Sequence, residues 1–254
     1  MFVEKLKKDE NLALLVRGCV EIPYICRAKI DKAMDFTMYD TLLQLPLFQG
    51  LGKNDITEIL AKVKFHFKKY EAGEYIYRQG DVCMEVAFIL NGTVMAETDS
   101  RSKTYVFCET LPVPHMVELY SLFGIYPCFH ASYKAVTAVN VLVIEKRYLL
   151  EQLNSYIPCG LNFSNIICSR VHYLYQRIWS DTTGSLRIRF VQFLMQRSCC
   201  LTGYKLLRIK MEDLATLLDD RRINVSRMLN ELQAEGLVTL RRKEIEIPAL
   251  EKWY

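Results

Sequence analysis

In the middle of the chain, hydrophobic and polar residues alternate as short segments, and glycines separate these segments. Between residues 65 and 144 the apolar stretches are brief, as in 86-VAFIL-90, and the last one, 135-AVTAVNVLVI-144, is rich in β-branched residues. β-branched residues favour strands, and glycines between strands supply the positive φ that tight turns require. We expect such turns at Gly73, Gly80 and Gly92. Many short strands at this spacing predict a β-barrel or a β-sandwich.

A helical period replaces the strand pattern after Pro158 and predicts one long helix over residues 159–180. The apolar residues that recur there at steps of three and four, close to a heptad, are Phe163, Ile167, Val171, Leu174 and Ile178. Ile166 and Tyr173 lie off this seam, so one side of the helix is expected to face its own domain. The seam itself predicts pairing with a second helix across a dimer, and packing within the monomer is the alternative.

The last quarter of the chain reads as a second domain. The segment 181-DTTGS-185 predicts a hinge and a helix cap, and an amphipathic helix over 186–198 follows it. A linking stretch over 201–209 leads to two short helices within 211–232 and to a β-hairpin around 241-RRKE-244. In the second short helix the apolar residues follow i, i+3, i+4, i+7 spacing, which predicts one buried side: Val225, Met228, Leu229 and Leu232.

The turn between the two short helices carries two aspartates. Asp219 stands where a left-handed backbone is required, and aspartate tolerates that conformation better than most residues. Asp220 follows it and is expected to cap the second helix, whose N-terminal dipole favours a carboxylate. A small residue, Ala215, lies in the first helix, where two crossing helices need close backbone approach.

The opposite side of the second helix is polar and basic. Arg222, Asn224 and Arg227 share that side, and Arg221 stands at the helix start. Arginine forks bind guanine O6 and N7 in pairs and neutralise phosphates. The hairpin that follows has Arg241, Arg242 and Lys243 at its tip. A solvated helix would explain the arginines alone, but the two-helix spacing and the basic hairpin together predict a winged helix-turn-helix that binds double-stranded DNA.

Charge supports a nucleic-acid partner for this domain. The net charge is +4, with 33 Lys/Arg and 29 Asp/Glu. From Leu186 onward there are 13 Lys/Arg and 9 Asp/Glu, so the whole excess of positive charge lies in the last quarter.

The N-terminus and the apolar content argue against a membrane protein. No run approaches the ~20 apolar residues of a membrane-spanning helix, and the short run 12-LALLV-16 is followed by no signal cleavage site. Residues 1–33 have no clear period, and Met34 and Met38 precede a short helix predicted at 38–51. We expect that translation starts at one of these methionines, or that residues 1–33 form a loose tail.

Nine scattered cysteines, among them the adjacent pair Cys199 and Cys200, form no CxxC pair and no zinc motif. They predict reduced, mostly buried thiols of a cytoplasmic protein, and a thiol redox switch is the alternative. No metal site is expected. No nucleophile elbow, phosphate-binding loop or dinucleotide fingerprint occurs, so an enzyme is not expected.

Together, these motifs resemble the Crp/Fnr superfamily of bacterial transcription regulators over roughly residues 38–250. The carriers of the resemblance are 73-GEYIYRQGD-81 with 88-FILNGTV-94 in the sensor half, 181-DTTG-184 at the hinge, and 213-DLATLLDDRRINVSRMLNEL-232 in the helix-turn-helix. The resemblance implies an α+β fold, with a cyclic-nucleotide-binding-like β-barrel (a double-stranded β-helix), a long dimerisation helix and a C-terminal winged helix-turn-helix. The corresponding ranges are an N-terminal extension at 1–37, the barrel at 38–150, the helix and hinge at 151–184, and the DNA-binding domain at 185–254.

The resemblance also implies a homodimer joined along residues 159–180 that reads two-fold symmetric sites, with RNA polymerase as a further partner. By position, Arg222 and Arg227 match base- and phosphate-contacting arginines, and Lys210 matches a phosphate-contacting position. Ile223 stands where a base-reading glutamate is common, and Arg221 where serine is usual.

The sensor half departs from the pattern of the cyclic-AMP-binding members. These members use a Gly-Glu pair followed by an Arg and a Ser or Thr that hold the phosphate. Here Glu118 is kept, Val117 replaces the glycine, and Phe129, His130 and Ala131 stand where Arg, Ser and a small residue would be. We therefore expect a small-molecule effector other than cyclic AMP, or none. The alternative is a cyclic-nucleotide- or redox-responsive sensor whose DNA binding depends on the effector.

Two other sensor chemistries known in the superfamily are not expected here. Cys19 and Cys26 have no third cysteine nearby, which argues against an iron–sulfur cluster. The four histidines are expected to be core or surface residues rather than haem ligands: His66, His115, His130 and His172.

Overall fold

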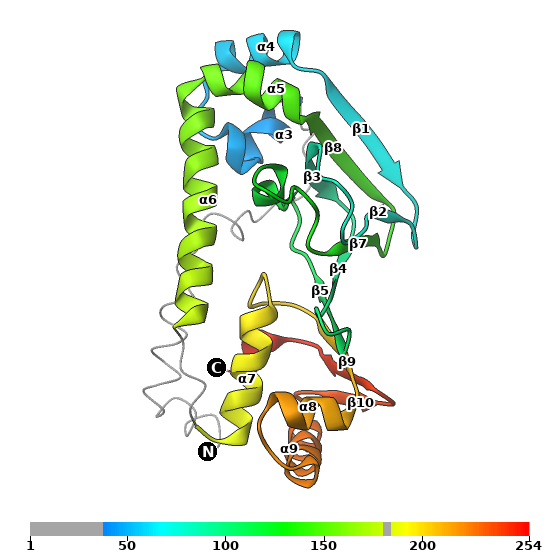
Figure 1. Cartoon of the computed structure of the whole chain (residues 1–254). Coiled ribbons are helices and arrows are strands. Elements are labelled where there is room, and N and C mark those ends of the chain that lie inside the picture. Colours follow the sequence, from blue (N-terminus) through cyan, green and yellow to red (C-terminus); the bar gives the residue numbers. More distant parts are fainter. Residues whose placement is uncertain (1–37, 180–183, 254) are drawn as a thin grey trace. The chain divides into compact units, whose positions relative to one another are not determined.

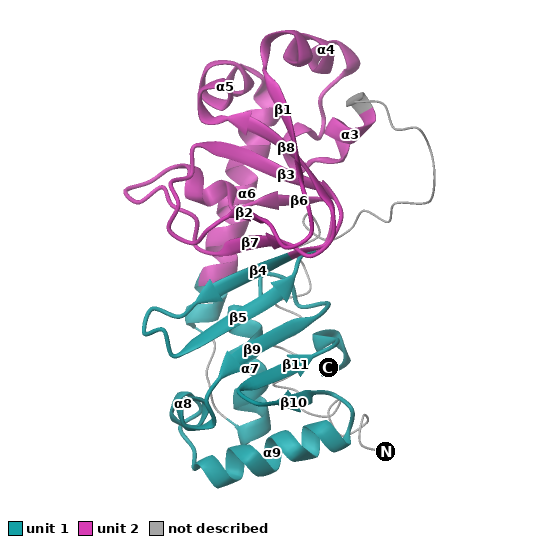
Figure 2. Cartoon of the chain, turned by 90° about the vertical axis from the view of Figure 1, so that its right-hand side faces the viewer, with its two compact units in different colours: residues 1–21, 95–111, 175–254 teal, residues 22–94, 112–174 magenta. Residues whose placement is uncertain are grey.

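The computed structural model describes residues 38–179 and 184–253 (Figure 1). The expectations for residues 1–37, and those for the hinge residues 181–183, fall outside these ranges. The chain divides into two compact units (Figure 2). Among the described residues, the N-terminal unit holds 38–94 and 112–174, and the C-terminal unit holds 95–111 and 175–253.

The N-terminal unit begins with helices and continues as short strands, as the sequence predicts. Its elements before the long helix are α3 (Met38–Gln44), η1 (Pro46–Phe48), α4 (Lys53–Lys62), β1 (Phe65–Tyr70), β2 (Tyr75–Tyr77), β3 (Glu85–Asn91), β6 (His115–Val117), η2 (Leu119–Leu122), β7 (Ser132–Ala135), β8 (Val139–Glu145), α5 (Lys146–Glu151) and η3 (Leu153–Ser155). The strand β4 (Val94–Asp99) starts at the end of this unit. The strands build open sheets rather than a closed barrel, in the order β1-β8-β3-β6, with β2 paired to β7.

The core of this unit lies under the apolar strand β8. Val139, Val141, Leu142, Val143 and Ile144 are all fully buried. β8 pairs antiparallel with β1 on one side and β3 on the other, so both of its backbone edges are hydrogen-bonded. Asn140 is exposed, but the continuous apolar run from Val141 to Ile144 is what a strand buried on both faces requires.

The three glycines expected at turns all have positive φ: +94° at Gly73, +92° at Gly80 and +88° at Gly92. At Gly92 a side chain is also excluded by space, because a Cβ would clash with the Ala138 carbonyl oxygen and the Val139 side chain. Gly92 therefore allows β3 to turn into β4 directly against the segment before β8.

The predicted long helix is α6 (Ile157–Ile178), which begins two residues earlier than expected. Pro158 lies in its first turn, where its missing N–H is not needed for a helical hydrogen bond. The Asn162 side-chain amide fixes the helix to the N-terminal unit by donating to the Leu47 and Gln49 carbonyls, at 3.2 and 2.8 Å. Tyr173 is buried, as expected for the side that faces its own domain.

The C-terminal unit contains the predicted winged helix-turn-helix and a hairpin from the middle of the sequence. Its elements are most of β4, β5 (Tyr105–Thr110), the end of α6, α7 (Leu186–Arg197), β9 (Lys205–Ile209), α8 (Met211–Leu217), α9 (Arg222–Ala234), β10 (Thr239–Arg241), β11 (Glu244–Ile247) and η4 (Leu250–Trp253). The Ser185 hydroxyl caps α7 by accepting from the Ile188 N–H. This confirms the cap predicted before residue 186.

The stretch 201–209, expected as a linker, contains strand β9. β9 pairs with β11 of the wing on one edge and with β5 on the other, which gives the order β10-β11-β9-β5-β4 (Figure 2). Four of its five residues are buried, so it lacks the alternation that identifies a strand from sequence. The domain ranges predicted from the sequence stay predictions. In the division into compact units, residues 95–111 belong to the C-terminal unit.

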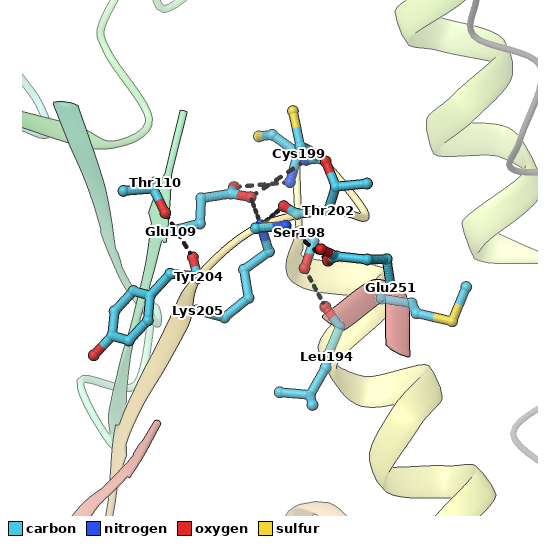
Figure 3. Close-up of polar contacts among 12 residues, drawn as sticks. Glu109, Thr110, Leu194, Ser198, Cys199, Thr202, Tyr204, Lys205 and Glu251 are labelled. Carbon is cyan, nitrogen blue, oxygen red and sulfur yellow. Dashed lines mark hydrogen bonds and ion pairs between the residues drawn. The ribbon is translucent and has the colours of Figure 1, made fainter. Parts of the chain in front are cut away.

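A buried ion pair joins β5 to the first residue of β9 (Figure 3). Lys205 and Glu109 are almost completely buried, and the Lys205 Nζ lies 3.2 Å from the Glu109 Oε2. The Glu109 carboxylate also accepts from the Cys199 and Cys200 backbone N–H groups at 2.8 and 3.3 Å, and Lys205 donates to the Thr202 carbonyl at 2.8 Å. Buried charges need this kind of compensation to be tolerated.

The apolar core of the C-terminal unit forms between α7, α9 and η4. Phe190 of α7 and Trp253 of η4 are buried with their ring centroids 5.9 Å apart. The four α9 residues predicted to be buried have exposed fractions of 6% or less: Val225, Met228, Leu229 and Leu232. One side of α9 therefore belongs to the core, which leaves the other side to solvent.

Candidate nucleic-acid interface and sensor site

The turn between α8 and α9 is built as the sequence predicts, with one difference at its cap. Asp219 has φ +48°, the left-handed conformation expected there. The Asp220 Oδ1 accepts from the Arg221 N–H at 2.8 Å and from the Asn224 side-chain amide at 2.7 Å, while Arg221 is the N-cap residue. Asp220 therefore stabilises the start of α9 from one residue further out than expected. The bond from Asn224, and then that from Arg221, hold the pKa of Asp220 below its usual value.

Two arginines of α7, which the sequence did not single out, hold both ends of α9. The Arg189 guanidinium donates to the Leu218 and Asp219 carbonyls at 2.7 and 3.0 Å and to the Asp220 carboxylate at 2.6 Å. Arg187 binds the Glu235 carboxylate through two bonds of 2.8 Å. Glu235 is the C-cap residue of α9, so α7 fixes the position of the helix at its first and last turns.

The exposed side of α9 carries the predicted basic residues. Arg222, Asn224 and Arg227 are exposed, as is Arg221 at the helix start. Ile223, Arg227 and Asn230 share one exposed surface of the helix with Ser226 and Glu231. The Arg222 Nε lies 3.2 Å from the Glu212 Oε1 of α8, and both side chains are about two-thirds exposed. This pair is open to solvent and therefore weak, so that Arg222 can be released to another anion at little cost.

The wing has the predicted hairpin geometry. β10 and β11 pair antiparallel, with Arg241 opposite Glu244, and Arg242 and Lys243 form the turn between them. Lys243 has φ +63°, and its carbonyl accepts from the Ile209 N–H at 2.9 Å, which ties the tip to the end of β9. All three basic side chains of the tip are exposed. Arg241 forms an ion pair of 3.0 Å with Glu246, and Lys210 is exposed at the N-cap of α8.

The candidate sensor site predicted from the sequence centres on the buried carboxylate of Glu118. It accepts hydrogen bonds from the Ser121 hydroxyl (2.6 Å), the His130 N–H (2.8 Å), the Ala131 N–H (3.0 Å) and the Tyr133 hydroxyl (2.8 Å). A carboxylate has about four acceptor positions, so its capacity is filled by the protein itself. Glu118 also has φ +28°, an uncommon conformation for a glutamate that these bonds hold in place.

The structure brings the predicted effector-site residues together around this carboxylate. Phe129 is buried and stacks on Tyr77, with the ring centroids 4.2 Å apart, and Ala131 is buried beside it. The His130 side chain is 67% exposed, and its Nδ1 lies 3.2 Å from the Glu118 Oε2. By the sequence resemblance, Phe129 stands at the position of the arginine in the cyclic-AMP-binding pattern, and the backbone N–H groups that follow it bind the Glu118 carboxylate.

One side of α6 is apolar and exposed. The positions 157, 161, 164, 168, 171, 175 and 178 recur at steps of four and three and are all exposed. Five of these seven residues are large and apolar, with exposed fractions of 56% to 76%: Ile157, Leu161, Val171, Tyr175 and Ile178. We call these seven positions the α6 stripe. The stripe shares Val171 and Ile178 with the seam predicted from the sequence, and Leu174 of that seam is also exposed. Phe163 departs from the prediction, because it packs edge-to-face on Phe123 of its own unit, with ring centroids 5.7 Å apart.

The cysteines of the described residues are largely buried. Cys83, Cys108, Cys159 and Cys200 are buried, whereas Cys168 and Cys199 are exposed. Burial raises the pKa of Cys108 to about 12 and that of Cys83 and Cys159 to about 11. These three thiols are therefore protonated and unreactive at neutral pH. Among residues 38–179 and 184–253, no group of three or more His, Cys, Asp or Glu side chains is placed to hold a metal ion.

Comparison with known families identifies two domains of the chain. Residues 67–156 match the family of cyclic nucleotide-binding domains, and residues 188–252 match the Crp-like helix-turn-helix domain. A cyclic nucleotide-binding fold followed by this helix-turn-helix is the domain order that the sequence resemblance implied. The chain belongs to the Crp/Fnr superfamily of transcription regulators. Its α+β fold and its function as a DNA-binding regulator agree with the expectations from the sequence.

Several solved structures are similar to this one at low sequence identity, with TM-scores below 0.5. The catabolite activator protein of Thermus thermophilus is 22% identical, with a TM-score of 0.48 over 80% of this chain and 93% of its own. The regulator DNR of Pseudomonas aeruginosa is 21% identical, with a TM-score of 0.42 over 87% of this chain and its full length. The c-di-GMP-responsive regulator CLP of Xanthomonas campestris is 17% identical, with a TM-score of 0.44 over 78% of this chain and 99% of its own.

No curated protein sequence matches the chain. Within the described residues of this Crp/Fnr regulator, no helix has the length and apolar character to cross a membrane. Regulators of this superfamily are generally not enzymes.

Proposed function

We propose that this Crp/Fnr regulator acts as a homodimer that reads a two-fold symmetric DNA site through α9 and requires no cyclic nucleotide. The observation that carries the DNA-reading proposal is the exposed, basic side of α9, whose other side is fixed in the core and whose ends are held by Arg187 and Arg189. A helix that is rigid on one side and basic on the other can enter a major groove without reorganising.

In the proposed complex the first turns of α9 face the base edges and the flanking positive groups contact phosphates. Arg222 reads a guanine through its fork once it leaves Glu212, and Arg227 and Asn224 lie beside it. Arg221, Lys210 and the wing residues Arg241, Arg242 and Lys243 neutralise phosphates on either side.

The dimer is proposed to form along the α6 stripe. Exposed residues at alternating steps of three and four are the a and d positions of a two-stranded coiled coil. Pairing two copies of α6 along this stripe would remove Val171, Tyr175 and Ile178 from water and would relate two α9 helices by a two-fold axis.

The filled acceptor positions of Glu118 support the proposal that no cyclic nucleotide acts at the sensor site. A nucleotide phosphate there would meet Phe129 instead of a guanidinium, and it would have to displace the Glu118 carboxylate from the His130 and Ala131 N–H groups. The effector is therefore a different, more apolar molecule, or none. RNA polymerase is the proposed further partner, and the cytoplasm, where both partners are found, is the proposed location.

The proposed function is tested by selecting binding sites from a random duplex library with the purified protein, at near-physiological salt and without added ligand. We expect enrichment of a two-fold symmetric site. Enrichment of an asymmetric site would contradict the dimer. A symmetric site that is enriched only when cyclic AMP or cyclic GMP is added would contradict the effector proposal and favour the effector-dependent sensor.

A direct measurement on the sensor site complements this selection. We expect saturating cyclic AMP to change neither the melting temperature of the protein nor its affinity for the selected site, because binding of a ligand to the folded state would raise the melting temperature. A clear rise with cyclic AMP that is absent in Ala131→Glu, where a second carboxylate blocks the same turn, would place the nucleotide at this site.

A further inference from the structure

The exposed side of α9 contains one residue that its basic character does not explain. Ile223 is 66% exposed in the first turn of the helix, although isoleucine is among the residues most often buried. Its neighbours in the turn are the polar residues Arg222 and Asn224, which are also exposed. The apolar core of α9 begins at Val225, on the other side of the helix, so Ile223 does not contribute to the core.

An isoleucine cannot form hydrogen bonds, which limits what it can recognise on a base edge. In the major groove each base presents hydrogen-bond donors or acceptors, and the apolar group among them is the C5-methyl of thymine. Against any other base edge, Ile223 would displace water from a polar atom without replacing the hydrogen bond, which costs free energy. Against the methyl group, two apolar surfaces leave water together.

We propose that Ile223 determines specificity by contacting the C5-methyl group of a thymine in each half-site. The inference rests on the proposed docking of α9 in the major groove. Ile223 follows Arg222 directly and lies one helical turn before Arg227, with which it shares one exposed surface. Consecutive Cα atoms are about 3.8 Å apart and base pairs about 3.4 Å, so this thymine lies within about two base pairs of the guanine that Arg222 contacts.

The contact is tested by removing only the methyl group from the DNA. In the selected site each thymine is replaced in turn by deoxyuridine, which keeps all the hydrogen-bonding groups of the base. We expect one position per half-site at which this change weakens binding about fourfold, the ratio that corresponds to about 0.8 kcal/mol for one buried methyl group. Changing both half-sites together should weaken binding about 15-fold.

The same series with Ile223→Ala connects the DNA methyl group to the side chain. We expect the deoxyuridine effect at that position to disappear, while Ile223→Val keeps most of it. Leu217→Ala is the matched control, because Leu217 is an exposed apolar residue of α8 in the same unit. Whatever its own affinity, this variant should show the wild-type deoxyuridine pattern.

The outcomes separate this inference from the proposed function. If a symmetric site is enriched but no thymine position depends on both its methyl group and Ile223, the inference is wrong while the DNA-reading function stands. If wild-type protein binds the selected duplex no more tightly than random DNA, the proposed function fails and the inference fails with it. Site selection with Ile223→Ala adds an independent readout, because it should lose the thymine preference at this position and keep the guanine.

Discussion

Asp219, Asp220 and Arg189 show how single residues position the proposed reading helix. Asp219 allows the left-handed turn, and Asp220 collects the Arg221 N–H and the Asn224 amide at the start of α9. Arg189 then binds the carbonyls of the turn, whose lone pairs no helix satisfies. The turn residues could be read from the sequence because their conformational needs are local. The partner of the turn could not, because it lies about 30 residues away.

Arg222 and Arg242 are predicted to affect DNA binding in different ways. Arg222→Ala should weaken binding to the selected site by about 1–3 kcal/mol and relax the base preference at one position per half-site, since a fork that reads guanine is lost. Arg242→Ala should weaken binding to all DNA sequences alike. It should also reduce the slope of log affinity against log salt concentration by about one, the contribution of one phosphate contact. Titrations of specific and random duplexes over a salt series distinguish the two. An Arg222→Ala protein with unchanged affinity and preference would mean that α9 docks differently.

His115 makes the stability of the N-terminal unit depend on pH. Burial, and then the charge of Arg170, lower the pKa of His115 to about 4, and its Nδ1 has no hydrogen-bond partner among the residues that the structure describes. Between about pH 6.5 and pH 4 the unfolded chain binds a proton at this residue while the folded chain does not, so the free energy of unfolding falls as the pH falls. The loss from this residue is at most about 3 kcal/mol.

His115→Gln should remove that part of the pH dependence. Denaturant unfolding of both proteins between pH 7 and pH 4 measures it, and the stability difference between them should change with pH in this interval. Parallel curves would show that His115 titrates normally in the folded protein.

At the scale of elements, the C-terminal unit depends on a strand that comes from the middle of the sequence. β5 extends the sheet of the wing through β9, and the Glu109–Lys205 pair joins these two strands (Figure 3). The Glu109 carboxylate also accepts from the backbone of the segment that follows α7. The sequence predicted the strand character of the middle region but gave no sign of this pairing. Tertiary packing decides which strands pair when they are about 100 residues apart, because the local sequence pattern of a strand does not specify which other strand it pairs with.

Lys205→Met is predicted to destabilise the C-terminal unit by about 3–5 kcal/mol, because it leaves the Glu109 carboxylate buried without its cation. The double variant Glu109→Gln with Lys205→Met should recover most of this loss, since the glutamine oxygen still accepts from the Cys199 N–H and no charge remains buried. Chemical denaturation of the three proteins measures both changes. A single variant within about 1 kcal/mol of the wild type would mean that the pair is reached by water.

At the scale of the whole molecule, the proposed assembly follows from the α6 stripe. Val171→Glu should convert the dimer to a monomer, because it places two like charges in the paired seam, whereas Gln176→Glu adds the same charge beside the stripe and should leave the dimer intact. Analytical sedimentation of both variants measures whether each is a monomer or a dimer. A Val171→Glu protein that remains dimeric would show that the copies pair elsewhere.

Cys168 provides a chemical test of the same assembly. It lies at the centre of the stripe, is exposed, and forms no disulfide with another residue that the structure describes. In a parallel pair of helices, facing Cα atoms fall within the 4.4–6.8 Å range of a disulfide, so mild oxidation should link two chains through Cys168. The link should be absent in Cys168→Ser. Its persistence in that variant would assign it to another cysteine and contradict the parallel register.

The sequence by itself determined the succession of a strand-rich region, a long helix and a helix-turn-helix, the glycine turns, the buried side of α9 and the basic side opposite it. These features follow from local backbone preferences and from periods of two and 3.6 residues, which a linear pattern carries. Only the tertiary structure decided that Phe163 faces its own unit rather than the stripe, that β9 is a strand, and that Glu118 is satisfied by residues 12 to 15 positions later. Each of these three features depends on which residues distant in the sequence come into contact. Burial and hydrogen bonding determine those contacts only in the folded chain.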